Sequence, residues 1–156
     1  MENKKYVLTD ETVNVNGIIL HRIKSISDFG DVKMGDLGGF VESETNLSVY
    51  GEAWVYDSAR VYGKAEVYGE AEVCGKAEVF GNAKVYDKAD YIIFKNWWSS
   101  GRFFTWTKSN NMWKVGCFYG SGEELIKKAY QDSELSGREY ERVVQYVNFI
   151  FADEKK

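Results

Sequence analysis

Hydrophobic positions in the middle of the chain recur every six residues. Seven units of the form Val-aromatic-Gly/Asp-x-Ala-x follow one another from residue 49 to residue 90. Neither an α-helix, with its period of 3.6, nor a flat strand, with its period of two, gives this spacing. A chain that turns a corner once per hexapeptide does, so the predicted fold class is mainly β, with a short β-solenoid similar to a left-handed β-helix. Its small inward position is occupied by seven alanines: Ala53, Ala59, Ala65, Ala71, Ala77, Ala83 and Ala89.

The other positions of the unit have distinct expected roles. Valine fills the centre of a face, and Gly or Asp lies at the turn, where a positive φ is tolerated. With three faces per turn of the chain, a turn takes about 18 residues. The aromatic position then forms columns, one of Tyr50, Tyr68 and Tyr86 and another of Tyr62 and Phe80. Cys74 occupies an aromatic position and is expected to pack there.

Three parts are expected along the chain: an N-terminal β-hairpin and cap over 1–36, the hexapeptide-repeat β-solenoid over 37–90 and a small α+β domain over 91–156. Asn16-Gly17 is typical of a type I′ turn and predicts a hairpin. Val41 and Leu47 are expected in phase with Ala53.

The C-terminal part loses the six-residue period. We expect a three-stranded meander from segments 91–94, 102–107 and 112–118, followed by two helices. Capping boxes beginning at Ser121 and Ser136 open these helices. The last helix has an apolar stripe consisting of Tyr140, Val143, Val144, Val147, Ile150 and Phe151.

Charge is unevenly distributed. The chain carries a net −4, but residues 36–90 hold eleven acidic and five basic side chains, a net of −6. This segment should repel phosphate, so no direct nucleic-acid binding is expected, and a basic protein is the better partner. No apolar run reaches the ~20 residues of a membrane span, and no signal peptide is recognisable. Two cysteines without metal-ligand spacing indicate the bacterial cytoplasm.

Candidate catalytic chemistry is sparse. His21 is the one histidine and lies outside the repeats. A zinc site rich in imidazoles is therefore not expected, and a hexapeptide acyltransferase would lack its usual histidine base. Cys117, in a predicted strand, is expected to pack in the core. We predict no enzyme, metal or cofactor.

Two surfaces favour partner binding. Trp97 and Trp98 are adjacent, so in a strand one of them faces outward. With Lys95, Arg102 and Trp106 they have the composition of an interface hot spot, although a small sheet also needs aromatic residues for its core. The aromatic column of the repeats forms either a packing row or a recognition surface.

The chain resembles the hexapeptide-repeat proteins carried by phages and prophages of gut Firmicutes. The resemblance rests on Leu20–Lys24, Asp28–Val32 and Gly35–Ser48, the Val-Tyr-Gly-x-Ala units, and Tyr91–Arg102 with its Lys-Asn-Trp-Trp-Ser-Ser-Gly-Arg sequence. It implies a mobile-element origin, a β-solenoid and no established enzymatic activity. By analogy it also implies a counter-defence role of the anti-CRISPR kind.

From this we expect a non-enzymatic, phage-derived protein-binding module that inhibits a basic host defence nuclease, foremost a CRISPR effector such as Cas9. The alternative is an oligomeric protein that binds or sequesters a nucleotide or sugar nucleotide, and a hexapeptide acyltransferase ranks last. Exposed aromatic columns favour a homo-oligomer, a dimer or a trimer.

Overall fold

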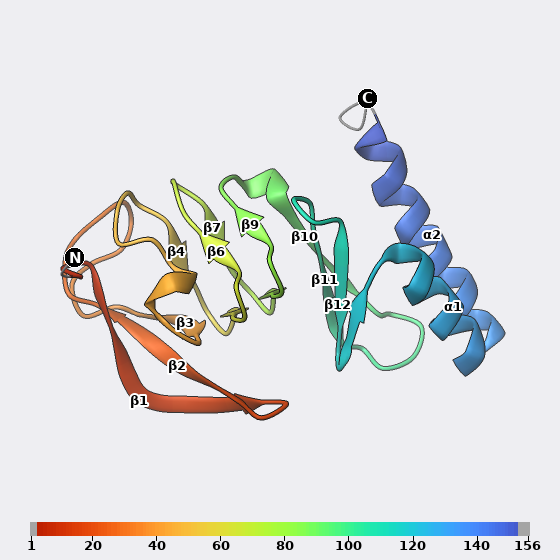
Figure 1. The fold of residues 1–156 in the computed structure, drawn as a ribbon, viewed down its shortest axis with the longest axis horizontal. Helices are drawn as coiled ribbons and strands as arrows, with labels where there is room; N and C mark the ends of the chain where they lie inside the picture. The colour runs from red at the N-terminus through yellow and green to blue at the C-terminus, as the bar shows by residue number, and fades with distance from the viewer. Residues whose placement is uncertain (1–2, 153–156) are drawn as a thin grey trace.

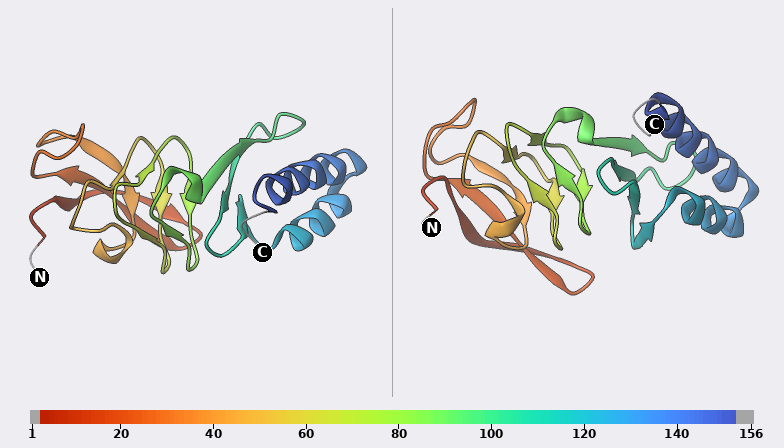
Figure 2. Two further views of the ribbon diagram at one scale, coloured as in Figure 1. Left: turned by 90° about the horizontal axis from the view of Figure 1, so that it is seen from above. Right: turned by 45° about the horizontal axis from the view of Figure 1, so that its top comes forward.

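The computed structural model describes residues 3–152. The molecule is elongated (Figure 1). A hairpin of β1 (Tyr6–Val15) and β2 (Ile18–Ser25) lies with the repeats at one end, and helices α1 (Gly122–Asp132) and α2 (Glu134–Ile150) lie at the other. The views in Figure 2 show the hairpin running along the repeats toward the C-terminal sheet.

The hexapeptide units form short parallel strands. Strands three units apart pair, β4 with β7, β5 with β8 and β6 with β9, in registers such as Trp54 opposite Glu72. The chain therefore returns to the same face after three units, as expected, and the valines of these strands are buried. Six of the seven repeat alanines are buried too, but Ala89 is exposed in a 3-10 turn, η2 (Lys88–Asp90), where the period ends. The six strands are β4 (Trp54–Val55), β5 (Arg60–Val61), β6 (Glu66–Val67), β7 (Glu72–Val73), β8 (Glu78–Val79) and β9 (Lys84–Val85).

At the alanine positions, the hydrogen bonds between successive turns all run in one direction: an N–H of the earlier turn donates to a carbonyl oxygen of the later turn. The N–H of Trp54 donates to the carbonyl oxygen of Ala71 at 3.0 Å, and the N–H of Arg60 donates to that of Ala77 at 2.9 Å. An alanine carbonyl in the first turn therefore needs a donor from outside the repeats, and the last turn needs acceptors.

Side chains of the N-terminal segment supply donors to the first turn. The Lys5 ammonium, just before β1, donates to the carbonyl oxygens of Ala53 at 2.6 Å and Ser48 at 3.0 Å. The Tyr6 hydroxyl donates to the carbonyl oxygen of Leu47 at 2.6 Å. Lys5 is buried as a result, and it fixes the N-terminal strand to the first turn.

Side chains of the C-terminal part supply acceptors to the last turn. The N–H of Glu78 donates to Thr105 Oγ1 at 2.9 Å, and the N–H of Lys84 donates to Ser109 Oγ at 2.8 Å. These bonds hold the C-terminal sheet against the repeats.

The predicted fold class, a β-solenoid of the left-handed β-helix kind, is wrong. The N-terminal hairpin is part of a sheet of the repeats: β3 (Leu37–Val41) pairs with β2 in antiparallel fashion and with β5 in parallel fashion, giving one mixed five-stranded sheet that runs from β1 to β8. The sheet after the repeats is antiparallel, and the other two sheets have two strands each. The long hairpin strands extend a sheet because β2 pairs directly with β3. The class is mainly β with mixed, antiparallel and small parallel sheets and two helices.

The predicted phase of the first turn is also wrong. Val41 and Leu47 lie opposite Val61 and Val67, so they occupy valine positions and not alanine positions. The first turn is longer than the later ones, because the segment that joins Leu47 to Val55 is longer than one repeat unit. Asn46, in the short turn η1 (Glu44–Asn46), is buried and donates to the carbonyl oxygen of Ala65 at 2.8 Å.

The C-terminal sheet has four antiparallel strands where three were expected, because Gly116, with φ of +55°, turns the chain inside the predicted third strand. The capping box at Ser121 is confirmed, but α2 begins earlier than predicted. Ser133 caps it, its Oγ accepting from the N–H of Ser136. The strands are β10 (Tyr91–Lys95), β11 (Phe103–Thr107), β12 (Met112–Val115) and β13 (Phe118–Gly120).

The predicted stripe of α2 is partly confirmed. Tyr140, Val144 and Val147 are buried against β11 and β12 residues, whereas Ile150 is exposed. The predicted packing of the cysteines is wrong, since both thiols are exposed.

Gly39 is required where β3 crosses the repeats. A Cβ at this position would lie 2.4 Å from the carbonyl oxygen of Ala59 and 2.7 Å from Val55 Cγ1. We expect Gly39→Ala to lower the free energy of unfolding by about 1–3 kcal/mol through overpacking, measured by urea denaturation. The exposed control Met34→Ala should stay within about 0.5 kcal/mol of the unsubstituted protein. Equal midpoints for both variants would contradict this packing.

The buried Lys5 makes stability depend on pH. Burial lowers its pKa from 10.5 to about 8, and the nearby Glu52 carboxylate opposes this. Between these two values the unfolded chain binds more protons than the folded one, so stability rises with pH there. Relative to Lys5→Met, the protein should gain about 1 kcal/mol between pH 7 and pH 9.5, allowing for solvent screening. A difference in unfolding free energy that is constant across these pH values would refute the assignment.

Candidate functional site

A groove between the repeats and the C-terminal sheet brings cationic side chains together. Its cavity has a volume of about 530 Å³. Arg60 and Glu78 come from neighbouring strands of the mixed sheet, whereas Lys76 comes from the turn before β8. We name it the basic groove and define it by six lining residues: Arg60, Lys76, Glu78, Ser100, Arg102 and Phe103.

The sheet register fixes one side of the basic groove. Arg60 lies opposite Glu78 in the β5–β8 pair, and Arg60 Nη1 is 3.3 Å from Glu78 Oε1. The ammonium group of Lys76 lies 5.9 Å from the centroid of the Phe103 ring. Phe103 is the first residue of β11 and is 42% exposed, so part of its ring is accessible to a ligand.

The turn before β11 supplies the other side. Gly101 has φ of +73°, and the N–H of Arg102 donates to Ser100 Oγ at 3.1 Å. The Arg102 guanidinium lies over Gly116, where an added Cβ would be 3.2 Å from Nη1. Gly116 therefore leaves the space that the guanidinium occupies.

The electrostatics of the basic groove differ from those of the rest of the repeats. Three cations and one carboxylate line it, whereas residues 36–90 as a whole carry a net −6. An anion that approaches this acidic molecule is attracted at the groove and repelled around it.

A second, more apolar cavity of about 350 Å³ adjoins the basic groove. The two cavities share Ser100, Arg102 and Gly116. Arg102 thus lies between a charged space and an apolar one. Apolar residues of the second cavity include Phe104, Val115, Phe118, Leu125 and Tyr140.

The two adjacent tryptophans that were predicted to bind a partner differ in exposure. Trp97 is 70% exposed, whereas Trp98 is half-buried, 4.9 Å between ring centroids from Tyr140, and donates from Nε1 to Ser136 Oγ. One of the two does face outward, but not for the predicted reason, because both lie in the turn that follows β10 and not in a strand. Trp106, predicted as a partner-binding residue, is 1% exposed and donates to Asn111 Oδ1, so that assignment is wrong.

The other predicted binding residues are divided between the edge of the basic groove and the repeats. Lys95 is exposed, with its ammonium group 6.0 Å from the Phe103 ring centroid, beside the basic groove. Tyr50 and Tyr86 are exposed on the repeats, and the Tyr68 and Tyr86 rings are 5.1 Å apart. The second predicted column is confirmed at the Tyr62–Phe80 contact of 4.5 Å, which is partly covered by the hairpin.

His21 lies in the hairpin, half-buried, with Nδ1 3.1 Å from the carbonyl oxygen of Thr9. Among the described residues that line the basic groove there is no histidine. Over residues 3–152, no group of three or more His, Cys, Asp or Glu side chains is placed to hold a metal ion. In the same range, neither helix combines the length and the apolar character needed to cross a bilayer.

Sequence reasoning missed Arg60 and Lys76. Arg60 could have been found, because the residues before Val67, Val73 and Val79 are all glutamates and the return to the same face after three units places Arg60 beside Glu78. The approach of Lys76 to Phe103 depends on how the C-terminal sheet meets the repeats, which has no local signal.

Comparison with known proteins gives one local similarity. No protein-family model matches the chain. A stretch of 40 residues is 45% identical to part of an Escherichia coli K12 protein described as "Uncharacterized acetyltransferase YdcK". The stretch is 26% of this chain and only 12% of that protein. The similarity is therefore to a segment of an acetyltransferase and not to the whole.

The two tryptophans should respond differently to substitution. We expect Trp98→Ala to lower the free energy of unfolding by about 2 kcal/mol or more, because it leaves a cavity against Tyr140. Trp97→Ala should change it by less than about 0.5 kcal/mol. Urea denaturation checks both values, and equal losses would show that Trp97 is also packed.

Proposed function

We propose that the chain is a non-enzymatic binding protein whose basic groove holds a phosphorylated small molecule with a planar ring, a nucleotide or sugar nucleotide. The supporting observation is the convergence of Arg60, Lys76 and Arg102 beside the exposed Phe103 ring.

Each part of the basic groove suits one part of such a ligand. Guanidinium groups donate in a fork that matches phosphate oxygens, and the lysine adds a point charge. An exposed phenylalanine can stack on a base, a contact worth about 1–3 kcal/mol. Cavities of roughly 300–1,000 Å³ are typical of small-molecule sites, and the volume of about 530 Å³ lies in this range.

The groove fits this ligand better than it fits a basic protein. The predicted anchor residue Arg102 lies among cations, which would repel the cationic cleft of a nuclease. A phosphorylated ligand has the complementary charge.

The local similarity to an acetyltransferase makes coenzyme A a candidate ligand. Coenzyme A contains an adenine nucleotide, so the basic groove could bind it through the same contacts to phosphate and base. Because the groove lining holds no histidine among the described residues, acetyl transfer would need another base, with the ion-paired Glu78 as the available carboxylate.

Calorimetric titration tests the proposal with ATP, UDP-glucose, coenzyme A, acetyl-coenzyme A and inorganic phosphate. We expect micromolar binding of at least one nucleotide, weaker binding of phosphate alone, and at least tenfold loss in Arg102→Glu and Lys76→Glu. The control Lys33→Glu makes the same charge change at an exposed lysine outside the groove and should retain binding. No binding below about 1 mM, or equal binding in Arg102→Glu, would refute the proposal; turnover of acetyl-coenzyme A would replace it with an enzymatic one.

A protein partner is the second candidate function, favoured by two separate features: the exposed Trp97 and the net negative charge of residues 36–90. In this role a phage-derived module, as a dimer or trimer, would inhibit a basic host nuclease such as a CRISPR effector. Capture with the tagged protein should then recover one dominant nuclease, lost in Trp97→Ala and in high salt. Recovery that is unaffected by both changes would remove this candidate.

A further inference from the structure

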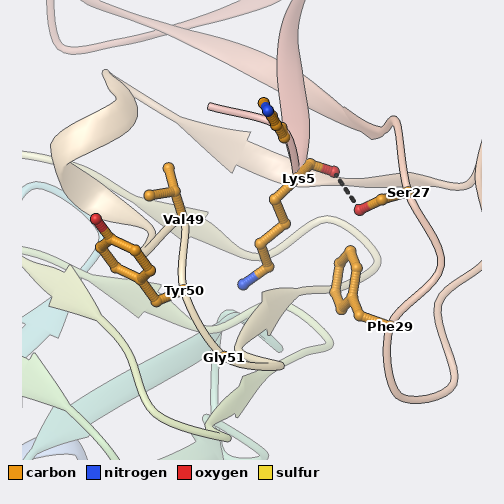
Figure 3. Close-up of a pocket in the computed structure, with 7 residues that line it drawn as sticks. Lys5, Ser27, Phe29, Val49, Tyr50 and Gly51 are labelled. Atoms are coloured by element: carbon orange, nitrogen blue, oxygen red, sulfur yellow. Dashed lines mark hydrogen bonds between the residues drawn. The ribbon is translucent and has the colours of Figure 1, made fainter. Parts of the chain in front are cut away.

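The first turn of the repeats is closed by a side chain of the N-terminal segment. Figure 3 shows the Lys5 side chain lying between Phe29 and the segment 49–51. Its ammonium group donates to the carbonyl oxygens of Ser48 and Ala53. These backbone groups therefore have a donor within the chain, in contrast to those along the edge of the C-terminal sheet.

The two larger sheets end in edge strands of different kinds. β1 is interrupted by a register shift between Leu8 and Thr12, where Asp10 and Glu11 are exposed. Bulges and charged side chains disfavour pairing with a further strand. Within residues 3–152, β10 pairs only with β11, without a register shift, and each of its residues is at least partly exposed. β10 is therefore a regular edge that is open to solvent.

The outer side of β10 carries a row of unpaired backbone groups. The N–H of Asn96 donates to the carbonyl oxygen of Arg102 at 2.8 Å, in the same register as the β10–β11 pair. Bonded pairs alternate along an antiparallel ladder, so the N–H and C=O groups of Tyr91, Ile93 and Lys95 point away from β11. Within residues 3–152 no other backbone group bonds to them.

An apolar stripe on α2 begins beside this edge. Tyr146, Phe149 and Ile150 are 54%, 80% and 40% exposed, and their spacing places them on one face of the helix. The ring centroid of Tyr146 lies 6.4 Å from that of Phe94, in β10. Residues 143–151 contain no charged side chain. We name the outer edge of β10 and this stripe together the β10–α2 surface.

We propose that the β10–α2 surface binds a second copy of the chain. Two β10 strands that pair in antiparallel fashion about a twofold axis at Ile93 place Ile93 opposite Ile93 of the second copy, and Tyr91 opposite its Lys95. In this register each outward N–H meets an outward carbonyl, and the two C-terminal sheets become continuous. The repeats and the helices lie on opposite sides of the sheet (Figure 1), so both α2 stripes lie on the same side of the joined sheet and contact each other. This pairing does not depend on the function proposed for the basic groove.

The chemistry of the β10–α2 surface favours this occupant. The edge of a strand forms its hydrogen bonds with another extended backbone, so a lipid surface would leave these groups unmatched. The uncharged stripe offers no complementary contact to a strongly charged partner. Tyr146 and Phe149 together expose on the order of 300 Å². The interface is therefore at the small end of the usual range, and we expect a dissociation constant on the order of 10 µM.

Sedimentation equilibrium of the full chain tests the proposal. Between about 2 µM and about 200 µM, the mass should rise from 17.9 kDa toward twice that value. Phe149→Glu should weaken association at least tenfold. Leu135→Glu makes the same kind of change at an exposed apolar residue near the start of α2 and should retain it. A monomer at every concentration, or equal weakening in both variants, would overturn the proposal.

Amide hydrogen exchange tests the strand pairing separately. At about 0.5 mM, the amides of Ile93 and Lys95 should exchange at least fivefold more slowly in the unsubstituted protein than in Phe149→Glu. The amides of Ile92 and Phe94 face β11 and should differ by less than about twofold. A dimer in which Ile93 and Lys95 show no such difference would refute the pairing through β10.

Substitution of Lys95 separates its backbone from its charge. Lys95→Pro removes an outward N–H but no bond to β11, a position at which an edge strand tolerates proline, and should weaken association at least tenfold. Lys95→Gln keeps the N–H and should stay within about twofold of the unsubstituted protein. Equal effects of the two variants would contradict a backbone role, and the exchange measurement decides the question if Lys95→Pro fails to fold.

Discussion

The directional hydrogen bonding between successive turns is the constraint on which the rest of the structure depends. In three successive repeats the N–H before a valine donates to the carbonyl oxygen of an alanine in the following turn: Trp54 to Ala71, Arg60 to Ala77 and Glu66 to Ala83. A stack built in this way has chemically different ends. Buried backbone groups without partners cost free energy comparable to a lost hydrogen bond. At these positions, therefore, the first turn requires donors and the last turn requires acceptors; elsewhere in the last turn the Tyr91 hydroxyl donates to the Glu72 carbonyl oxygen at 2.7 Å.

The segments on either side of the repeats meet these different requirements. Lys5 and Tyr6 carry N–H and O–H donors to the first turn, and Thr105 and Ser109 carry oxygen acceptors to the last. The basic groove lies at one of these junctions, where the C-terminal sheet accepts from β8.

The periodic part of the molecule was predictable and its junctions were not. The return to the same face after three units, the buried valines and the Asn16-Gly17 turn follow from local patterns. The pairing of β2 with β3, which overturned the predicted fold class, depends on contacts between segments that share no period. The prediction that Trp106 binds a partner was wrong because tryptophan is common both in the core of a small sheet and at interfaces. Composition alone does not distinguish the two. Lys76 and Arg102 come together only through the docking of two segments distant in sequence.

The two different ends also determine which changes in length the protein can accept. Addition or loss of three hexapeptide units would keep every donor and acceptor of the flanking segments in register and move the C-terminal sheet by one strand spacing, about 4.8 Å. A change of a single unit would instead bring a different face to the sheet, separating Arg60 and Glu78 from Arg102. The number of hexapeptide units can therefore change only in steps of three without altering the face that meets the C-terminal sheet. A relative with one unit more or fewer is expected to lack the basic groove, even if it retains every residue that lines the groove.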